Sequence, residues 1–206
     1  MRDKPNLVVV AGCNGSGKST FSSLILPKHF SIFDADRRKK EIYDSFTFDF
    51  ELRDEMAWNN TNQEFKQLVL TSISAKRDFA YETNFNSAPL FWAEKFKEAG
   101  YTINLLYFCL ENTDLAKERV AIRFENGGHY VNDKEVENRY ISGFENLNKS
   151  YEFFDVIFLL ETSTNKKAPK LIVEYQKGQQ AIVIPPLPSY LKLHCPDFLK
   201  AVSNHD

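Results

Sequence analysis

The sequence contains the stretch Gly12-Cys13-Asn14-Gly15-Ser16-Gly17-Lys18-Ser19. This stretch fills every fixed position of the phosphate-binding pattern G-x-x-x-x-G-K-[ST]. Its glycines allow backbone conformations that a Cβ atom would forbid, so successive N–H groups can point at a phosphate. Lys18 supplies a mobile positive charge for the β- and γ-phosphates, and the Ser19 hydroxyl is suited to hold Mg²⁺. The alternative interpretation is a glycine-rich turn with a solvated lysine.

The segments on either side of this loop have the order that a phosphate-binding loop requires. Residues 7–11 are a short β-branched apolar run, typical of a buried parallel strand. Residues 19–26 follow a helical pattern that ends before Pro27. Strand, loop and helix predict an α/β fold of the P-loop NTPase and kinase type. The residues expected to bind the nucleotide are Gly12, Cys13, Asn14, Gly15, Ser16, Gly17, Lys18, Ser19 and Thr20.

Length and composition favour one domain over residues 1–206. The chain is 43% hydrophobic and contains 18 phenylalanines, which is enough to form one substantial core. A formal charge of −2 gives no general attraction to nucleic acid or to an anionic membrane. We expect a cytoplasmic protein, because no segment has the pattern of a signal peptide or a membrane span. The three cysteines lack metal-type spacing and are expected to be reduced thiols.

Further apolar runs extend the predicted sheet. Together with residues 7–11, the runs at 29–33, 79–83, 101–110 and 153–160 predict a mostly parallel five-stranded sheet flanked by helices. Residues 171–175 and 181–184 predict a β-hairpin appended beyond this sheet, followed by a helical tail, over roughly 168–206. Residues 50–77 are helical in pattern, but Asn59-Asn60-Thr61-Asn62 are poor helix formers. We therefore expect two helices, or one bent helix, covering a substrate cleft.

Two carboxylates, Asp34 and Asp36, follow the predicted second strand. Ligands of open α/β sheets bind at the carboxyl ends of the strands. In an extended chain the two side chains would point to opposite sides, so we expect different roles for them. Asp36 is the candidate general base, with a helix N-cap as the alternative, and Asp34 is a candidate ligand of Mg²⁺ through water.

Several other polar or aromatic residues are candidates for the acceptor site. The basic run Arg37-Arg38-Lys39-Lys40 is typical of a solvated face, but Arg37 can contact a phosphorylated acceptor. Glu82, followed by Thr83, can bind acceptor hydroxyls or lie on the Mg²⁺ side. For Trp58 and Phe65 we favour a place in the core over contact with a base or sugar.

Residues 112–140 have the pattern of a phosphate lid. A cap at Asn112 or Thr113 starts a helix that carries Arg119 and Arg123 on one face. Asn126-Gly127-Gly128-His129 interrupts it, and Asn132 with Glu135 resembles a capping box that starts a helix bearing Arg139. A guanidinium group stays charged and binds two phosphoryl oxygens at once, so these arginines are candidate catalytic residues. Surface ion pairs are the alternative, and for His129 we favour a turn residue.

With these features in place, the chain resembles the zeta-toxin family of P-loop kinases, especially its short single-domain members. The most specific parts are residues 11–20, Glu82-Thr83, and Gly127-Gly128-His129 with Asn138-Arg139-Tyr140. The resemblance implies transfer of the ATP γ-phosphate to a hydroxyl of a UDP-linked amino sugar, and an antitoxin protein as a partner. It also implies Asp36 as base, Lys18, Arg139 and Arg119 or Arg123 on the phosphates, and Glu82 with Thr83 on the acceptor.

The sequence therefore predicts a kinase that uses ATP, or GTP as the alternative donor, with Mg²⁺ and a small hydroxylated acceptor. Two other functions stay open. One is a nucleotide or polynucleotide kinase that uses residues 37–40 on the acceptor phosphate, although the net acidity argues against a nucleic acid. The other is an NTP-binding switch without transfer chemistry, against which the position of Asp36 argues.

Overall fold

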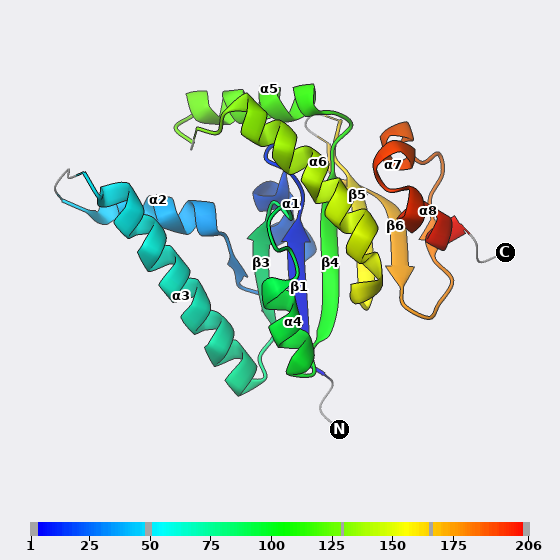
Figure 1. Ribbon diagram of the computed structural model, residues 1–206, viewed down its shortest axis with the longest axis horizontal. Coiled ribbons are helices and arrows are strands. Elements are labelled where there is room, and N and C mark those ends of the chain that lie inside the picture. Colours follow the sequence, from blue (N-terminus) through cyan, green and yellow to red (C-terminus); the bar gives the residue numbers. More distant parts are fainter. Residues whose placement is uncertain (1–3, 48–50, 129, 165–166, 204–206) are drawn as a thin grey trace.

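The computed structural model describes residues 4–47, 51–128, 130–164 and 167–203. Within these residues one sheet of seven strands forms the centre, in the order β2-β3-β1-β4-β5-β6-β7 (Figure 1). The first five strands in that order are parallel, and β6 and β7 are antiparallel to their neighbours. The strands are β1 (Asn6–Ala11), β2 (Ile32–Phe33), β3 (Phe79–Thr83), β4 (Thr102–Cys109), β5 (Val156–Glu161), β6 (Lys170–Gln176) and β7 (Ile182–Val183).

Helices cover both faces of the sheet (Figure 1). In this view α4 and α6 lie in front of the strands and α1 lies behind them, while α2 and α3 project to the left. The helices are α1 (Lys18–Ile25), α2 (Ala35–Ser45), α3 (Arg53–Ala75), α4 (Phe91–Glu98), α5 (Thr113–Glu125), α6 (Asp133–Ser150), the 3₁₀ turn η1 (Tyr151–Phe153), α7 (Ser189–His194) and α8 (Pro196–Ser203). No helix of the described residues is both long and apolar enough to cross a bilayer.

Every residue of β1 from Leu7 to Ala11 is apolar and buried. Leu7, Val9 and Ala11 face the larger core cluster, which includes residues of α4 and α6. Val8 and Val10 face a smaller cluster on the other side of the sheet, against which α1 packs. Since side chains alternate along a strand, an apolar residue at every position is needed when both faces are buried. The sheet thus places the loop after β1 at the carboxyl ends of the central strands.

The predicted five parallel strands are confirmed, but the hairpin is not appended beyond the sheet. Its first strand, β6, pairs antiparallel with β5, and β7 pairs with β6, so the hairpin continues the same sheet. Ile172, Val173 and Tyr175 are buried against the main core. Burial of this apolar face explains why the hairpin joins the sheet instead of standing apart.

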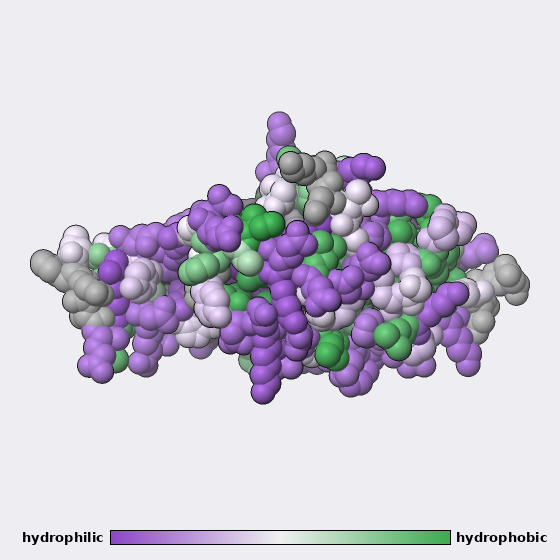
Figure 2. Space-filling view, turned by 90° about the horizontal axis from the view of Figure 1, so that it is seen from above, coloured by the Kyte–Doolittle hydropathy of each residue, from purple (hydrophilic) through white to green (hydrophobic). Residues whose placement is uncertain are grey.

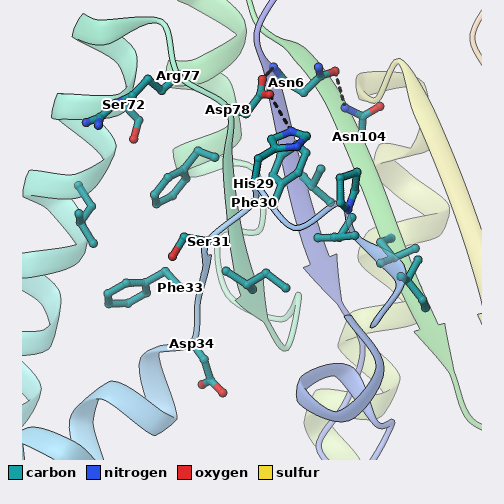
Figure 3. Close-up of a pocket in the computed structure, with 18 of the residues that line it drawn as sticks. Asn6, His29, Phe30, Ser31, Phe33, Asp34, Ser72, Arg77, Asp78 and Asn104 are labelled. Atoms are coloured by element: carbon teal, nitrogen blue, oxygen red, sulfur yellow. Dashed lines mark hydrogen bonds and ion pairs between the residues drawn. The ribbon is translucent and has the colours of Figure 1, made fainter. Parts of the chain in front are cut away.

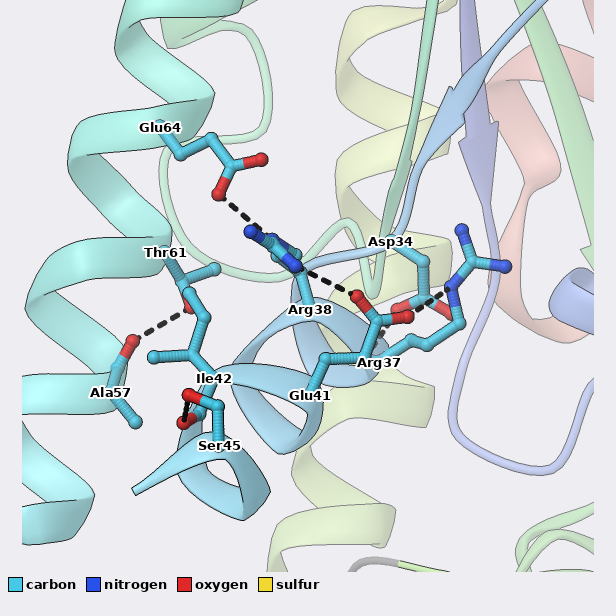
Figure 4. A network of polar contacts seen from close by, with 9 residues as sticks. All are labelled: Asp34, Arg37, Arg38, Glu41, Ile42, Ser45, Ala57, Thr61 and Glu64. Atoms are coloured by element: carbon cyan, nitrogen blue, oxygen red, sulfur yellow. Dashed lines mark hydrogen bonds and ion pairs between the residues drawn. The ribbon is translucent and has the colours of Figure 1, made fainter. Parts of the chain in front are cut away.

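Of the two alternatives predicted for the long helical segment, two separate helices is wrong. Residues 59–62 lie inside α3, which is continuous from Arg53 to Ala75, while Phe50 lies outside the described residues. Thr61 donates its hydroxyl to the carbonyl of Ala57 at 2.8 Å, and both side chains are fully buried where α3 packs on α2 (Figure 4). Tertiary packing therefore outweighs the low helix propensity of this stretch.

Both helix starts predicted for the lid are confirmed. Asn112 caps α5 and accepts the N–H of Leu115, and Asn132 caps α6 and accepts the N–H of Glu135. Most of α6 is a core helix, and Gly143 lies so close to the sheet that a Cβ there would be 2.8 Å from the Tyr107 hydroxyl. We call the end of α5 and the start of α6, with the described residues between them, the lid tip. His129 lies outside the described residues.

Candidate active site

The loop after β1 has the conformation of a phosphate cradle. Gly12 has a φ of 141°, and a Cβ there would lie 2.5 Å from the carbonyl oxygen of Phe108, so only glycine fits. Gly17 is left-handed, with φ 85°, and no side chain caps the start of α1 at Lys18. The N–H groups of the first turn of α1 are therefore free to bind a phosphate, an arrangement that the helix dipole also favours.

Lys18 lies across the mouth of this loop. Its Nζ donates to the carbonyl oxygens of Gly12 (2.7 Å) and Cys13 (3.0 Å), and to Oδ1 of Asn84 (3.3 Å). Burial lowers the pKa of Lys18, and the surrounding acidic groups oppose this shift only in part. A phosphate beside Nζ would favour its charged form. Lys18 is thus half-buried and already oriented by three oxygen atoms, unlike the solvated lysine of the alternative interpretation.

Glu82, at the end of β3, lies beside Ser19, the loop residue that is suited to hold Mg²⁺. Its Oε2 accepts the hydroxyl of Ser19 at 2.8 Å, and its Oε1 accepts the hydroxyl of Ser22 at 3.2 Å. Burial, and then the charge of Asp34, raise the pKa of Glu82. Mg²⁺ in kinases is held by one hydroxyl or one or two carboxylates together with phosphate oxygens and water. Ser19, Glu82 and Asp34 fit that ligand set, and of the two predicted roles of Glu82 this contact favours the Mg²⁺ side.

We expect Glu82→Gln to stabilise the protein at about pH 8 and to leave its stability unchanged below about pH 4. The raised pKa means that the folded state binds a proton at Glu82 more tightly than the unfolded state does. The carboxylate therefore costs folding free energy above its folded pKa and costs none where both states are protonated. Thermal unfolding of both proteins across this pH range measures the difference. Glu118→Gln, on the exposed side of α5, is the control, and an equal gain in that variant would contradict the assignment.

The residue that caps α2 is Asp34, not Asp36. Asp34 is the N-cap of α2, and its Oδ1 accepts the N–H of Arg37 at 3.1 Å. Asp36 lies in the first turn of α2 and caps nothing, so the N-cap alternative for Asp36 is wrong. The two side chains do not alternate along a strand, because the helix begins at Ala35. Asp36 therefore remains available for chemistry.

The basic run on α2 is largely paired with acids of the same helix and of α3 (Figure 4). Arg38 contacts Glu64 at 2.8 Å and Glu41 at 3.0 Å, and Arg37 lies 3.8 Å from Glu41. Lys39 and Lys40 contact acidic residues at 2.7 and 3.0 Å. The charges of this run are thus largely neutralised at the surface, as its pattern predicts. Of its two arginines, Arg37 but not Arg38 lines the cavity beside the phosphate loop.

The lid arginines reach the phosphate loop from two helices. On α5, Arg119 donates to the carbonyl oxygens of Thr162 (2.8 Å), Ser163 (3.1 Å) and Gly15 (3.3 Å). On α6, Arg139 donates to Oδ1 of Asn14 at 2.8 Å and also contacts Glu135. The Nε of Arg139 is buried and has no hydrogen-bond partner within the described residues. Both arginines therefore hold the loop, and Arg139 keeps one donor group unused.

One cavity of about 760 Å³ brings most of the predicted site residues together; we call it the main cavity. Gly12, Cys13 and Ser16 are buried members of the loop and do not line this cavity. Seen from above, the face that carries α5 is mostly hydrophilic (Figure 2). The predicted residues that line the main cavity are Asn14, Gly15, Gly17, Lys18, Ser19, Thr20, Asp34, Asp36, Arg37, Glu82, Thr83, Arg119, Arg123 and Arg139.

A second cavity of about 700 Å³ adjoins the first; we call it the side pocket. Asp36, Lys40, Trp58, Gly128 and Arg139 line both cavities, so these residues mark their boundary. The other residues of the side pocket are Lys39, Tyr43, Asp44, Asp54, Glu55, Phe124, Gly127 and Tyr130. The expected core position of Trp58 is wrong, because this side chain is 44% exposed, whereas Phe65 packs against the core as expected.

Two groups of lining residues were not among the predicted site residues. Asn84 and Asn86 follow β3, and Thr162 and Thr164 follow β5. The available signal was their place directly after predicted parallel strands, where ligands of α/β sheets bind. Only the folded chain shows that Asn84 reaches Lys18 and that the loop after β5 lies against Arg119.

A larger cavity, of about 1530 Å³, shares Asp34 and Arg37 with the main cavity (Figure 3). Its polar groups hold strands and loops together: Asp78 accepts the N–H of Asn6 at 2.7 Å and lies 3.2 Å from His29. Asn104 donates to Asn6 at 3.3 Å. The phosphate loop and the lid arginines do not line this cavity, so we place the candidate active site in the main cavity and the side pocket.

Several solved structures share the fold of this chain. In a solved structure from the PezAT chromosomal toxin–antitoxin system of Streptococcus pneumoniae, a chain is 16% identical, with a TM-score of 0.64, over 98% of this chain and 85% of that chain. The native AvrRxo1-ORF1:-ORF2 complex contains a chain that is 13% identical, with a TM-score of 0.72, over 93% of this chain and 63% of that chain. A structure of that complex with ATP has a TM-score of 0.67 at 12% identity, over 87% of this chain and 60% of that chain.

At these identities the structures show a shared fold. No curated protein sequence matches the chain at a significant level. The family model described as "Zeta toxin" matches residues 1–182, a range that contains the phosphate loop, Asp36, Glu82 and all three lid arginines. The chain therefore belongs to the zeta-toxin family, a family of P-loop kinases.

Proposed function

We propose that this protein transfers the γ-phosphate of ATP to a hydroxyl group of a small acceptor, and that the acceptor is a UDP-linked amino sugar. One observation carries the proposal. The uncapped start of α1, Lys18, Arg139 and Asp36 all border the main cavity, and the side pocket opens directly beyond Asp36. A donor phosphate in the main cavity and an acceptor in the side pocket would therefore meet beside a carboxylate.

In this proposal the residues of the chain act by position and charge. The acceptor oxygen forms a bond to the γ-phosphorus while the bond from that phosphorus to the β–γ bridging oxygen breaks, and ADP leaves. Asp36 accepts the proton of the attacking hydroxyl, and Lys18 and Arg139 stabilise the charge on the phosphoryl oxygens. Ser19 and Glu82, with Asp34, would hold Mg²⁺, which neutralises phosphate charge when bound.

Incubation with γ-labelled ATP tests the proposal. Label transferred to a UDP-linked amino sugar supports it, and label on a nucleotide or on a 5′-hydroxyl oligonucleotide would support the alternative kinase. Nucleotide binding without any labelled product would support the non-catalytic switch. The pairing of Arg38, Lys39 and Lys40 with acids argues against binding of a nucleic acid at α2.

We also propose an antitoxin protein as a partner. Membership of the zeta-toxin family and the likeness to a chain from a toxin–antitoxin system support this proposal. Expression of the active protein should then arrest growth, and Lys18→Ala should relieve the arrest. Equal growth with both proteins, at equal expression, would contradict toxicity.

Replacing Arg139 by lysine should lower turnover by roughly 10²-fold or more, because lysine keeps the charge but loses the planar fork. We expect a smaller loss for Arg119→Lys, since three of the groups that Arg119 contacts are backbone carbonyls. Steady-state rates with γ-labelled ATP measure both effects. The control is Arg38→Lys, in an exposed ion pair, which should change stability by at most about 1 kcal/mol and leave turnover unchanged. Parental turnover in both lid variants would place these arginines among structural ion pairs.

A further inference from the structure

The turn that follows β3 contains two residues in a backbone conformation that they rarely adopt. Phe85 has a φ of 58° and Ala88 a φ of 43°, so both lie in the left-handed region without being glycines. A Cβ atom makes this region costly, and such residues persist only where the surrounding structure holds them. Strained residues of this kind gather at functional sites. The contacts of the turn show what holds it and what it serves.

The turn presents two carboxamide side chains to the main cavity. Asn84 and Asn86 both line this cavity, and Oδ1 of Asn84 accepts the ammonium group of Lys18 at 3.3 Å. Phe85, between them, is fully buried, and its ring centroid lies 6.1 Å from that of Tyr107. The core therefore anchors the turn at Phe85, and the neighbouring Asn84 is directed toward the phosphate loop.

Asn146, on α6, binds the backbone of this turn. Its Nδ2 donates to the carbonyl oxygen of Phe85 at 2.8 Å and to that of Asn86 at 2.6 Å. A carboxamide nitrogen carries two hydrogens, so each carbonyl can receive one of them. Oγ1 of Thr83 accepts the N–H of Phe85 at 3.0 Å. Asn146 thus fixes the two peptide groups that follow the left-handed Phe85, and Thr83 fixes the one that precedes it.

One face of α6, the helix that leads out of the lid tip, connects this contact to a lid arginine. Arg139, Gly143 and Asn146 follow one another at spacings of four and three residues, so they lie on the same face of the helix. Arg139 contacts Asn14 of the phosphate loop at 2.8 Å, and a Cβ at Gly143 would lie 3.2 Å from the carbonyl oxygen of Asn84. A single helix therefore sets the positions of the loop and of the turn relative to each other.

We propose that Asn146 is a positioning residue for phosphoryl transfer: it holds the strained turn after β3 and thereby keeps Asn84 against Lys18. The inference rests on the proposed function for the reaction that Lys18 serves. Asn146 is not among the described residues that line the main cavity, so it acts through the turn. Without its two N–H donors the turn can relax toward negative φ, and Asn84 then leaves Lys18.

Asn146→Asp tests this role with almost no change of shape. A carboxylate cannot donate and repels the two carbonyl oxygens, so the kcat for label transfer should fall by roughly 10- to 100-fold, the scale for a small misplacement of reacting groups. Asn146→Gln keeps both N–H donors and should recover a large part of the activity, which a loss of packing alone would not predict. Parental kcat in Asn146→Asp would overturn the inference.

A double-mutant cycle shows whether Asn146 acts through Asn84. If it does, Asn84→Ala lowers kcat by itself, and adding Asn146→Asp to that variant lowers kcat by less than about twofold more, because both changes remove the same contact with Lys18. Losses that multiply would mean that Asn146 affects the reaction by a separate route, and the inference would be wrong.

Asn148 provides the matched control on the same helix. Its Oδ1 accepts the N–H groups of Asp197 at 2.9 Å and Phe198 at 3.1 Å, at the start of α8, and it lines none of the three cavities. Asn148→Ala should lower the unfolding temperature and keep parental kcat, measured where the variant is folded. A loss of kcat equal to that of Asn146→Asp would show that any loosening of α6 suffices, and would contradict a specific role for Asn146.

Nucleotide binding separates this inference from the proposed function. Lys18 contacts the donor phosphates whether or not transfer follows, so Asn146→Asp should weaken binding of a non-hydrolysable ATP analogue by roughly fivefold or more, the scale of one well-placed hydrogen bond. Asn148→Ala should stay within about twofold. If this difference is found but the parental protein labels no acceptor, the role of the turn stands and the kinase function is wrong. If the parental protein and Asn146→Asp transfer label equally well, the kinase function stands and the inference is wrong.

Discussion

Replacing Lys18 by alanine is expected to abolish phosphoryl transfer and to weaken ATP binding. Lys18 is the loop side chain that carries a positive charge to the phosphates, and its Nζ is already held by the carbonyls of Gly12 and Cys13 and by Asn84. Because these partners fix its position before the nucleotide arrives, little side-chain entropy should be lost on binding. No other lysine of the main cavity lies on the loop, so none is placed to substitute for it.

The fold should survive this substitution. Burial lowers the pKa of Lys18, so keeping the charged amine in place costs folding free energy that alanine would not cost. The freed carbonyl oxygens border an open cavity where water can bind them, and we expect stability to change by no more than about 1 kcal/mol. Nucleotide titration, labelled transfer and thermal unfolding of the same preparation measure the three quantities. Lys28→Ala, beyond the end of α1, is the control. Parental turnover in Lys18→Ala would contradict phosphoryl transfer at this loop.

Asp36→Asn is expected to reduce turnover by roughly 10²–10⁴-fold, with nucleotide affinity nearly unchanged, the range for losing a positioned proton acceptor. The structure makes this variant easier to interpret than the sequence does. Asp34 caps α2, so the substitution at Asp36 leaves the cap intact. The remaining structural effect is the loss of one negative charge from the first turn of a helix, which is worth about 0.3–1 kcal/mol.

A matched control exists for that charge effect. Asp133 lies in the first turn of α6, is exposed and lines neither cavity. Asp133→Asn should reproduce the small change in unfolding temperature and keep full turnover. If Asp36→Asn also keeps full turnover, Asp36 is a helix-dipole residue and some other group takes the proton.

The local features of the fold could be predicted from the sequence. The phosphate loop is defined by glycines and a lysine at fixed, close spacing. The backbone conformation that these glycines allow depends only on neighbouring residues. The same is true of the caps at Asn112 and Asn132, where a side chain bonds an N–H three residues away. The apolar runs of the five parallel strands are equally local, because a strand buried on both faces needs an apolar residue at nearly every position.

The contacts that make a site were decided by the tertiary structure. Ser19 and Glu82 are 63 residues apart, and Asn14 and Arg139 are 125 apart, so no local pattern brings either pair together. The capping role of Asp34 depended on where α2 begins, and the exposure of Trp58 on how α3 projects from the sheet. The phosphate loop, its flanking elements and the helix starts could be predicted without the structure, because these depend on interactions within a few residues. Only packing between distant segments decided the continuous α3, the joining of β6 to β5 and the aromatic side pocket, since burial of each face depends on which other element covers it.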